Sequence, residues 1–136
     1  MVEINATYEG GLRCEATHGP SGNKLITDAP VDNHGKGEAF SPTDLVATAL
    51  GTCMTTIMGI VAEKDGINLE DVSVHLVKEM VNKPVRRIAK VTLEFQMPAG
   101  LSEPERKRLE NAALHCPVHN CLHPDIETPV EFHYPD

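Results

Sequence analysis

The sequence of 136 residues contains no tryptophan, two tyrosines and three phenylalanines. Aromatic side chains for stacking on bases are therefore scarce, and a core must be built from aliphatic residues. Basic residues are also few, because 12 lysines and arginines stand against 20 aspartates and glutamates, for a formal net charge of −8. A chain without a basic surface or stacking aromatics is not expected to bind nucleic acid or anionic lipid.

The N-terminus lacks the basic region and apolar run that mark a secretory signal. We therefore expect a cytoplasmic protein, where reducing conditions leave the four cysteines as free thiols. The stretch 45–62 has no charge, but six of its 18 residues are threonine or glycine. Its length and polarity favour a helix buried in protein over a membrane span.

Alternating apolar and polar residues predict strands in the first part of the chain. Two strands, at 2–8 and 12–17, are joined by a pair of glycines, and a third follows at about 24–27. Residues 28–40 contain proline, glycine and scattered charges without periodicity. This composition predicts a loop.

The segment Ser41-Pro42-Thr43-Asp44 predicts the start of a helix. It offers a hydroxyl N-cap, a proline at the first helical position and a carboxylate that can reach back to the cap. The helix is expected to run to about Lys64. Apolar residues cover nearly every face of it, which predicts that protein surrounds it.

Further alternation predicts two strands joined as a hairpin, at 72–76 and 89–96. A second capping pattern at 102–105 begins another helix, and a last strand lies at 130–134. The order β-β-β-α-β-β-α-β predicts an α+β fold in one domain, 1–136.

Two cysteines, Cys53 and Cys116, have sequence neighbours that affect the reactivity of their thiols. Cys53 is in the middle of the apolar helix, where burial away from positive charge raises the pKa of a thiol and makes it a poor nucleophile. Cys116 precedes Pro117, which can begin a new helical turn and place the sulfur beside N–H groups that favour a thiolate. Neither cysteine by itself specifies a function.

Taken together, the two contexts resemble the OsmC/Ohr family of osmotically inducible and organic hydroperoxide resistance proteins. Ser41-Pro42-Thr43-Asp44-Leu45, followed by small residues and Gly51-Thr52-Cys53-Met54, resembles the family's Pro-x-x-Leu helix start and first cysteine. Cys116-Pro117-Val118-His119-Asn120-Cys121-Leu122 resembles its second signature, Cys-Pro-Val-x-x-x-Leu. The resemblance covers most of the chain.

The resemblance implies an OsmC-like fold, with antiparallel sheets and a long central buried helix, in an intertwined homodimer. It also implies a cysteine-based hydroperoxide reductase in oxidative-stress defence. Cys53 would become a sulfenic acid, Cys116 would condense with it to a disulfide, and Arg13 would supply the cation that ionises Cys53. No cofactor or metal is implied. The reductant would be a dithiol, of the lipoyl type by resemblance, and the loop 28–40 is a candidate lid.

The expected substrate is an organic hydroperoxide rather than hydrogen peroxide. Leu45, Ala49 and Met54 are the residues expected to wall the site, and their apolar side chains suit an alkyl group.

The chain departs from the family at one position. The better-characterised peroxidases of the family carry a glutamate ten residues before the first cysteine, where it holds the arginine. Thr43 occupies that position here and cannot form the salt bridge. Asp44 lies one residue along, about 100° around the helix. Thr43, Asp44 and Glu38 are therefore the candidate supporting residues.

Two other functions remain open. Cys116, His119, Cys121 and His123 would suit zinc, although four ligands within eight residues are unusually crowded. The other alternative is a small dimeric domain that binds a hydrophobic molecule without catalysing its conversion. The missing glutamate favours this alternative. Cys14 alternates with Leu12 and Ala16 and is expected in the core.

Overall fold

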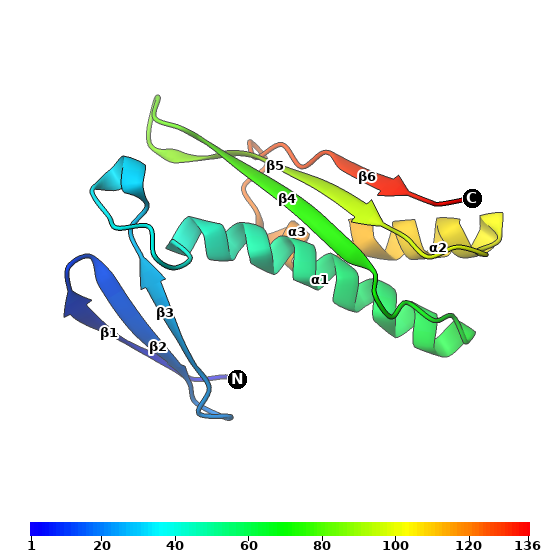
Figure 1. The fold of residues 1–136 in the computed structure, drawn as a ribbon, viewed down its shortest axis with the longest axis horizontal. Helices are drawn as coiled ribbons and strands as arrows, with labels where there is room; N and C mark the ends of the chain where they lie inside the picture. The colour runs from blue at the N-terminus through cyan, green and yellow to red at the C-terminus, as the bar shows by residue number, and fades with distance from the viewer. The chain divides into compact units, whose positions relative to one another are not determined.

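A computed structural model describes all 136 residues. In chain order its elements are β1 (Ile4–Gly10), β2 (Arg13–His18), β3 (Lys24–Asp28), the 3-10 helix η1 (Val31–Asn33), α1 (Pro42–Asp65), β4 (Ser73–Val81), β5 (Arg87–Gln96), α2 (Glu103–Leu114), α3 (Pro117–Cys121) and β6 (Val130–His133) (Figure 1). The expected α+β class is confirmed. The chain divides into two compact units, Met1–Val46 and Ala47–Asp136, and the expectation of a single domain stays a prediction.

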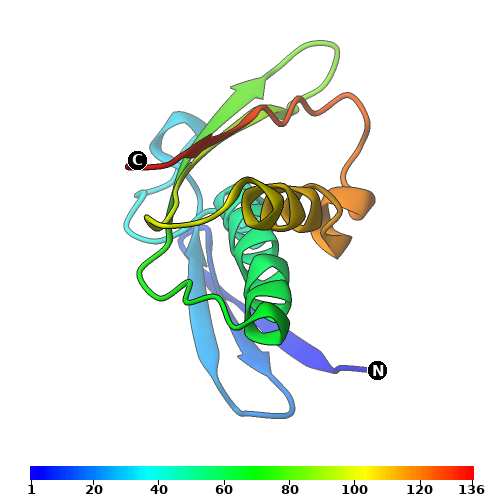
Figure 2. The ribbon, with the colours of Figure 1, turned by 90° about the vertical axis from the view of Figure 1, so that its right-hand side faces the viewer.

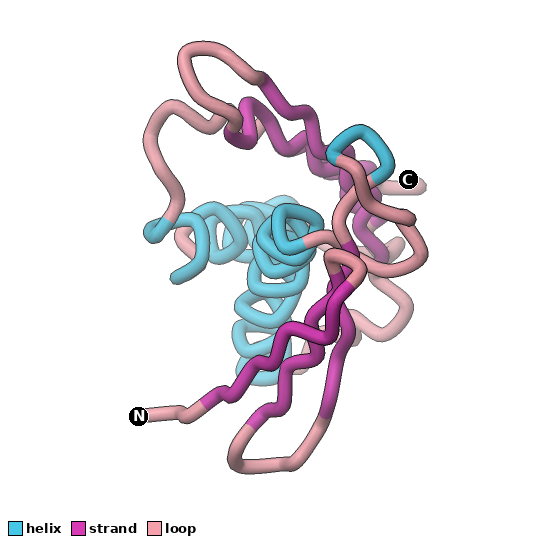
Figure 3. Tube along the Cα trace, turned by 90° about the vertical axis from the view of Figure 1, so that its left-hand side faces the viewer, coloured by secondary structure: helices cyan, strands magenta, loops and turns pink.

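The first unit contains a three-stranded antiparallel sheet in the order β1-β2-β3 (Figure 3). The predicted turn at Gly10-Gly11 is shifted by one residue, because Gly10 still pairs with Arg13 and the turn consists of Gly11 and Leu12, both with positive φ. The loop after β3 is closed at its base, because Asp28 N–H donates to the carbonyl of Phe40 at 3.0 Å and Ala29 N–H donates to the carbonyl of Leu12 at 3.1 Å. The predicted loop therefore exists, with a 3-10 turn inside it.

The second unit contains the sheet β4-β5-β6. β4 and β5 form the predicted antiparallel hairpin, but β6 pairs with β5 in parallel. The expected antiparallel sheets are therefore present except for this one parallel pair. The chain between β5 and β6 runs through α2 and α3, and parallel neighbours need such a crossover. Within this unit, α2 and the body of α1 lie on the same side of the sheet (Figure 2).

The core of the second unit forms where α1 and α2 pack on β5. Gly51 allows close approach, since a Cβ there would lie 2.9 Å from Leu76 Cδ1 of β4. Phe95 of β5 stacks on Phe132 of β6 with ring centroids 5.2 Å apart. The largest side chains with no exposed surface are Leu50, Met54, Met58, Leu93, Phe95 and Leu109.

The burial of α1 is narrower than the sequence predicted. Its buried positions recur every three or four residues and form one stripe. On the helix, Val46 remains 38% exposed and Ile60 48% exposed. By length and composition α1 would also be able to cross a membrane, a property that core helices of soluble proteins share. The buried stripe accounts for its place in the core of the second unit.

Leu93 provides a test of this core. We expect Leu93→Ala to lower the free energy of unfolding by roughly 2–5 kcal/mol, because it removes a fully buried side chain and leaves a cavity. Val77 of β4 is 43% exposed, so Val77→Ala should cost less than about 1 kcal/mol. Urea unfolding measures both, and equal losses would contradict the assigned core.

Candidate active site

The second unit brings Cys53 and Cys116 together. Cys53 comes from the middle of α1 and is half-buried, and Cys116 is the fully buried residue that precedes α3. Cys53 lies near enough to Cys116 to raise the pKa of its thiol, and both thiols are free. Two residues that are far apart in sequence and were predicted as a pair are therefore neighbours.

Local backbone structure places the sulfur of Cys116. Pro117 begins α3 and makes Cys116 its N-cap, as the sequence predicted. The N–H of His119 donates to Cys116 Sγ at 3.3 Å. Burial raises the pKa of the Cys116 thiol, and hydrogen bonding to Cys53 raises it further, while the N–H groups of His119 and Val118 lower it. These N–H groups favour the thiolate, as expected, but burial outweighs them and the net shift of the pKa is upward.

Arg13 lies in the first unit, at the start of β2. Asp28 of β3 is its partner in the strand register. Arg13 Nη2 donates to Asp28 Oδ2 at 3.1 Å, and Nε donates to Oδ1 at 3.4 Å. Nη2 also donates to Glu38 Oε2 at 3.3 Å. The guanidinium is thus held by two carboxylates, one of which the sequence did not single out.

These contacts keep the carboxyl group of Asp28 charged. The Arg13 guanidinium holds the pKa of Asp28 below its ordinary value, and the N–H of Glu38, which donates to Asp28 Oδ2 at 2.9 Å, lowers it further. The same partnership with Asp28 raises the pKa of Arg13. The cluster is an ionised pair with a second carboxylate beside it.

The three predicted supporting residues have different surroundings. Glu38 contacts Arg13, as described above. Asp44 caps α1, since its Oδ2 accepts the N–H of Ser41 at 2.9 Å. The hydroxyl of Thr43 lies 3.2 Å from that of Ser41. Asp28 was missed because a charged residue at the end of a short strand is ordinary, and only the register of β2 with β3 reveals its partner.

Other predicted residues fall elsewhere. Met54 has no exposed surface and belongs to the core, so it cannot wall an open site. Cys14 is half-buried and does not belong to the hydrophobic core, contrary to expectation, because the core consists of second-unit residues. Leu45 and Ala49 are half-buried on α1.

The crowded histidines and cysteines of 115–123 take separate partners. A ring nitrogen of His119 lies 3.2 Å from Thr128 Oγ1, and His123 Nδ1 accepts the N–H of Asp125 at 3.1 Å. Cys121 is exposed. No three of these side chains have their ligand atoms gathered, so the arrangement does not support the zinc alternative.

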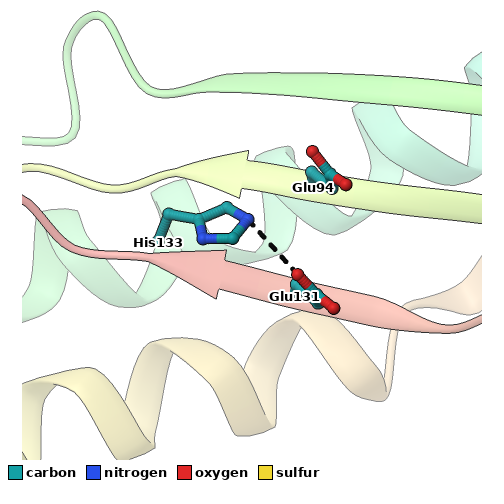
Figure 4. A group of neighbouring side chains, drawn as sticks. All are labelled: Glu94, Glu131 and His133. Atoms are coloured by element: carbon teal, nitrogen blue, oxygen red, sulfur yellow. Dashed lines mark ion pairs between the residues drawn. The ribbon is translucent and has the colours of Figure 1, made fainter.

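One group of metal-type side chains does gather, on β5 and β6. Glu94 and Glu131 are register partners, and His133 lies two residues beyond Glu131 on the same face (Figure 4). His133 Nε2 is 3.4 Å from Glu131 Oε2. Glu131 and His133 are exposed and Glu94 is half-buried. Strand register alone brings them together, and such surface groups are common without a metal.

The environments of the cysteines predict a difference in reactivity. Because the raised pKa keeps Cys116 protonated at neutral pH and the residue is buried, iodoacetamide should modify it much more slowly than the exposed Cys121. Site-resolved mass spectrometry at pH 7 measures the two rates. In urea the difference should disappear, and equal rates in the folded protein would contradict the described burial.

Comparison with known proteins bears on the family and the fold. The family model for OsmC-like proteins matches residues 35–131. A crystal structure from Psychrobacter arcticus 273-4, named for an osmotic stress induced and detoxification response, is 45% identical, with 98% of this chain and 96% of that chain covered and a TM-score of 0.92. An OsmC-like protein from Mycoplasma pneumoniae is 16% identical, with 98% and 96% covered and a TM-score of 0.81.

A third similar structure is an organic hydroperoxide resistance protein OsmC from Legionella pneumophila, 22% identical, with 97% and 96% covered and a TM-score of 0.75. At this identity it supports the fold alone. No curated protein matches the sequence. The family match over 35–131 and the 45% identity to the Psychrobacter protein show that this chain belongs to the OsmC-like protein family.

Proposed function

We propose that this protein is a thiol-dependent peroxidase that reduces organic hydroperoxides in oxidative-stress defence. The juxtaposition of the Cys53 and Cys116 thiols carries the proposal. Two neighbouring free thiols are the pair that a disulfide would join once one of them is oxidised. The name of the Psychrobacter relative, which refers to stress and detoxification, agrees with such a role.

In the proposed reaction, the Cys53 thiolate attacks the hydroperoxide. An S–O bond forms, the O–O bond breaks, and the alcohol leaves with a proton, which leaves Cys53 as a sulfenic acid. Cys116 then attacks that sulfur, forms the S–S bond and releases water. A dithiol reductant reopens the disulfide by thiolate exchange. Such a cycle suits a cytoplasmic protein and needs no cofactor.

The surroundings of the two thiols support this order. Cys116 is buried and its pKa is raised, which argues against it as the thiol that attacks the peroxide and leaves it the second step. Cys53 is only half-buried and is open to a substrate. We assign Arg13 as the cation that ionises Cys53, following the family resemblance.

The residues around Cys53 on α1 favour an organic substrate. Ala49 and Ile57 lie one turn before and one turn after Cys53, on the same side of the helix, and both are half-buried. Apolar neighbours of this kind favour an alkyl or aryl group over water. We therefore expect cumene hydroperoxide to react faster than hydrogen peroxide.

Titration of free thiols tests the proposal. Cumene hydroperoxide should lower the thiol titre of the parent protein and produce a Cys53–Cys116 linked peptide. Cys116→Ser should accumulate a sulfenic acid at Cys53 without that disulfide, and Cys53→Ser should keep its titre. The exposed Cys121 offers a matched control, since Cys121→Ser should oxidise like the parent.

A parent protein that keeps its full thiol titre with both peroxides would overturn the proposed function and favour a binding protein without turnover. A linked peptide through Cys121 instead of Cys116 would overturn the assigned pair. Faster oxidation by hydrogen peroxide than by cumene hydroperoxide would contradict the substrate class.

We also propose that the protein is a homodimer. Every residue of β1 is exposed, although the strand carries the apolar side chains of Ile4 and Tyr8. Leu25 and Ile26 of β3 and Ile60 of α1 are also 44–48% exposed. A small sheet needs a covered apolar face to be stable. A second copy of the chain would supply that cover and bury a matching surface.

Light scattering coupled to size exclusion tests the dimer. The parent should have twice the chain mass of 14.8 kDa. Ile60→Glu places a charge on the exposed side of α1 and should shift the population toward the single-chain mass. Val85, 62% exposed in the connection between β4 and β5, provides the control, since Val85→Glu should leave the mass unchanged. A parent of single-chain mass would contradict the homodimer.

A further inference from the structure

The residue that holds Arg13 most closely is Asp28 of β3. The family instead places a glutamate at the start of the helix that carries the first cysteine. Asp28 makes two hydrogen bonds to the guanidinium, from Nη2 at 3.1 Å and from Nε at 3.4 Å. Two such bonds fix the plane of a guanidinium as well as its position. Glu38 makes one, at 3.3 Å. The geometry of Arg13 therefore depends chiefly on Asp28.

Asp28 and Glu38 also differ in how far their carboxylates are buried. The side chain of Asp28 has no exposed surface, whereas that of Glu38 is 63% exposed. Water and salt weaken an exposed ion pair more than one whose carboxylate is covered. A buried carboxylate persists in charged form only when its oxygens are well bonded, and Asp28 accepts from Arg13 and from the N–H of Glu38.

The backbone around Asp28 is also fixed on both sides. Asp28 N–H donates to Phe40, and the next residue, Ala29, donates to Leu12, immediately before Arg13 in the chain. The register of β2 and β3 places Asp28 directly opposite Arg13. The carboxylate is therefore supplied by a strand whose position is set by main-chain bonds, and Glu38 is supplied by the loop that those bonds close.

We propose that Asp28 is the positioning residue for Arg13, and that it takes the part that Thr43 cannot play at the start of α1. The consequence for catalysis rests on the proposed function, in which Arg13 ionises Cys53. Without Asp28, the guanidinium keeps its charge but loses its orientation. The Cys53 thiolate is then no longer stabilised by a cation in a fixed position.

The sign of the effect distinguishes positioning from simple electrostatics. The charged groups that face Asp28 are Arg13 from β2 and Lys36 and Glu38 from the loop. Replacing Asp28 by asparagine removes one negative charge from this group. By charge alone, that change would lower the pKa of any thiol that the cluster influences. If Asp28 acts by orienting Arg13, the pKa of Cys53 rises instead.

Asp28→Asn is the central variant, because asparagine keeps the shape and an acceptor oxygen for the N–H of Glu38. The pH dependence of Cys53 alkylation, resolved by mass spectrometry, gives the ionisation midpoint. We expect the midpoint to rise by about one pH unit, which is about a tenfold slower alkylation at neutral pH. Glu15→Gln is the matched control, since Glu15 lies on β2 and pairs with Lys24 at 3.3 Å, and it should keep the parent midpoint.

A double-mutant cycle with Arg13→Ala tests whether Asp28 acts through Arg13. Once Arg13 is absent, Asp28→Asn should have no further effect on Cys53. Should Asp28→Asn fail to fold by circular dichroism, Asp28→Glu, which keeps the charge but shifts the carboxylate by one methylene, should also raise the midpoint. An unchanged or lowered midpoint in the folded variant would overturn the inference, and so would an Arg13→Ala protein with the parent profile.

This experiment stays distinct from the test of the peroxidase. Alkylation needs no peroxide, so a parent protein that does not react with cumene hydroperoxide would overturn the proposed function while the Cys53 profile still tests Asp28. Conversely, the parent protein could turn over hydroperoxide while the Asp28→Asn variant keeps the parent's pH dependence of Cys53 alkylation. That result would overturn only the role of Asp28.

Discussion

The packing of one stripe of α1 against β5 determines where Cys53 can lie. Leu50 and Met54 belong to this stripe and have no exposed surface, and Cys53 sits beside them at its edge. Because successive helical residues differ by about 100°, a rotation by one residue would carry the thiol into the core or into solvent. The half-buried position of Cys53, next to the Cys116 thiol, is therefore a consequence of how the core is packed.

The position of Cys116 depends on a different and purely local constraint. α2 ends just before Cys116, and Pro117 begins α3, so Cys116 is the N-cap of α3. Its backbone is therefore extended and its sulfur faces the first turn of α3. Burial then keeps that thiol protonated. The fold thus gives two neighbouring cysteines unequal environments, and unequal environments are how a protein assigns different chemical steps to identical groups.

Sequence reasoning succeeded where the signal is local. The capping box at Ser102 and Glu105 is present, Pro117 begins a helical turn, and the strands lie close to the alternating segments. It failed where the answer depends on which strands become neighbours. The parallel pairing of β6 and the meeting of Asp28 with Arg13 are both matters of register, to which single residues contribute almost no signal. The site residues themselves stay predictions that the proposed experiments address.

The place of Asp28 in the chain has a consequence for the proposed chemistry. Arg13, Asp28 and Glu38 all belong to the unit Met1–Val46, whereas Cys53 and Cys116 belong to the unit Ala47–Asp136. A glutamate on the helix start would tie the arginine to the element that also carries the first cysteine. Asp28 instead orders the arginine within its own sheet. In the proposed mechanism, Asp28 would thus preorganise the cation independently of the nucleophile, and Arg13 would reach Cys53 with its orientation already fixed.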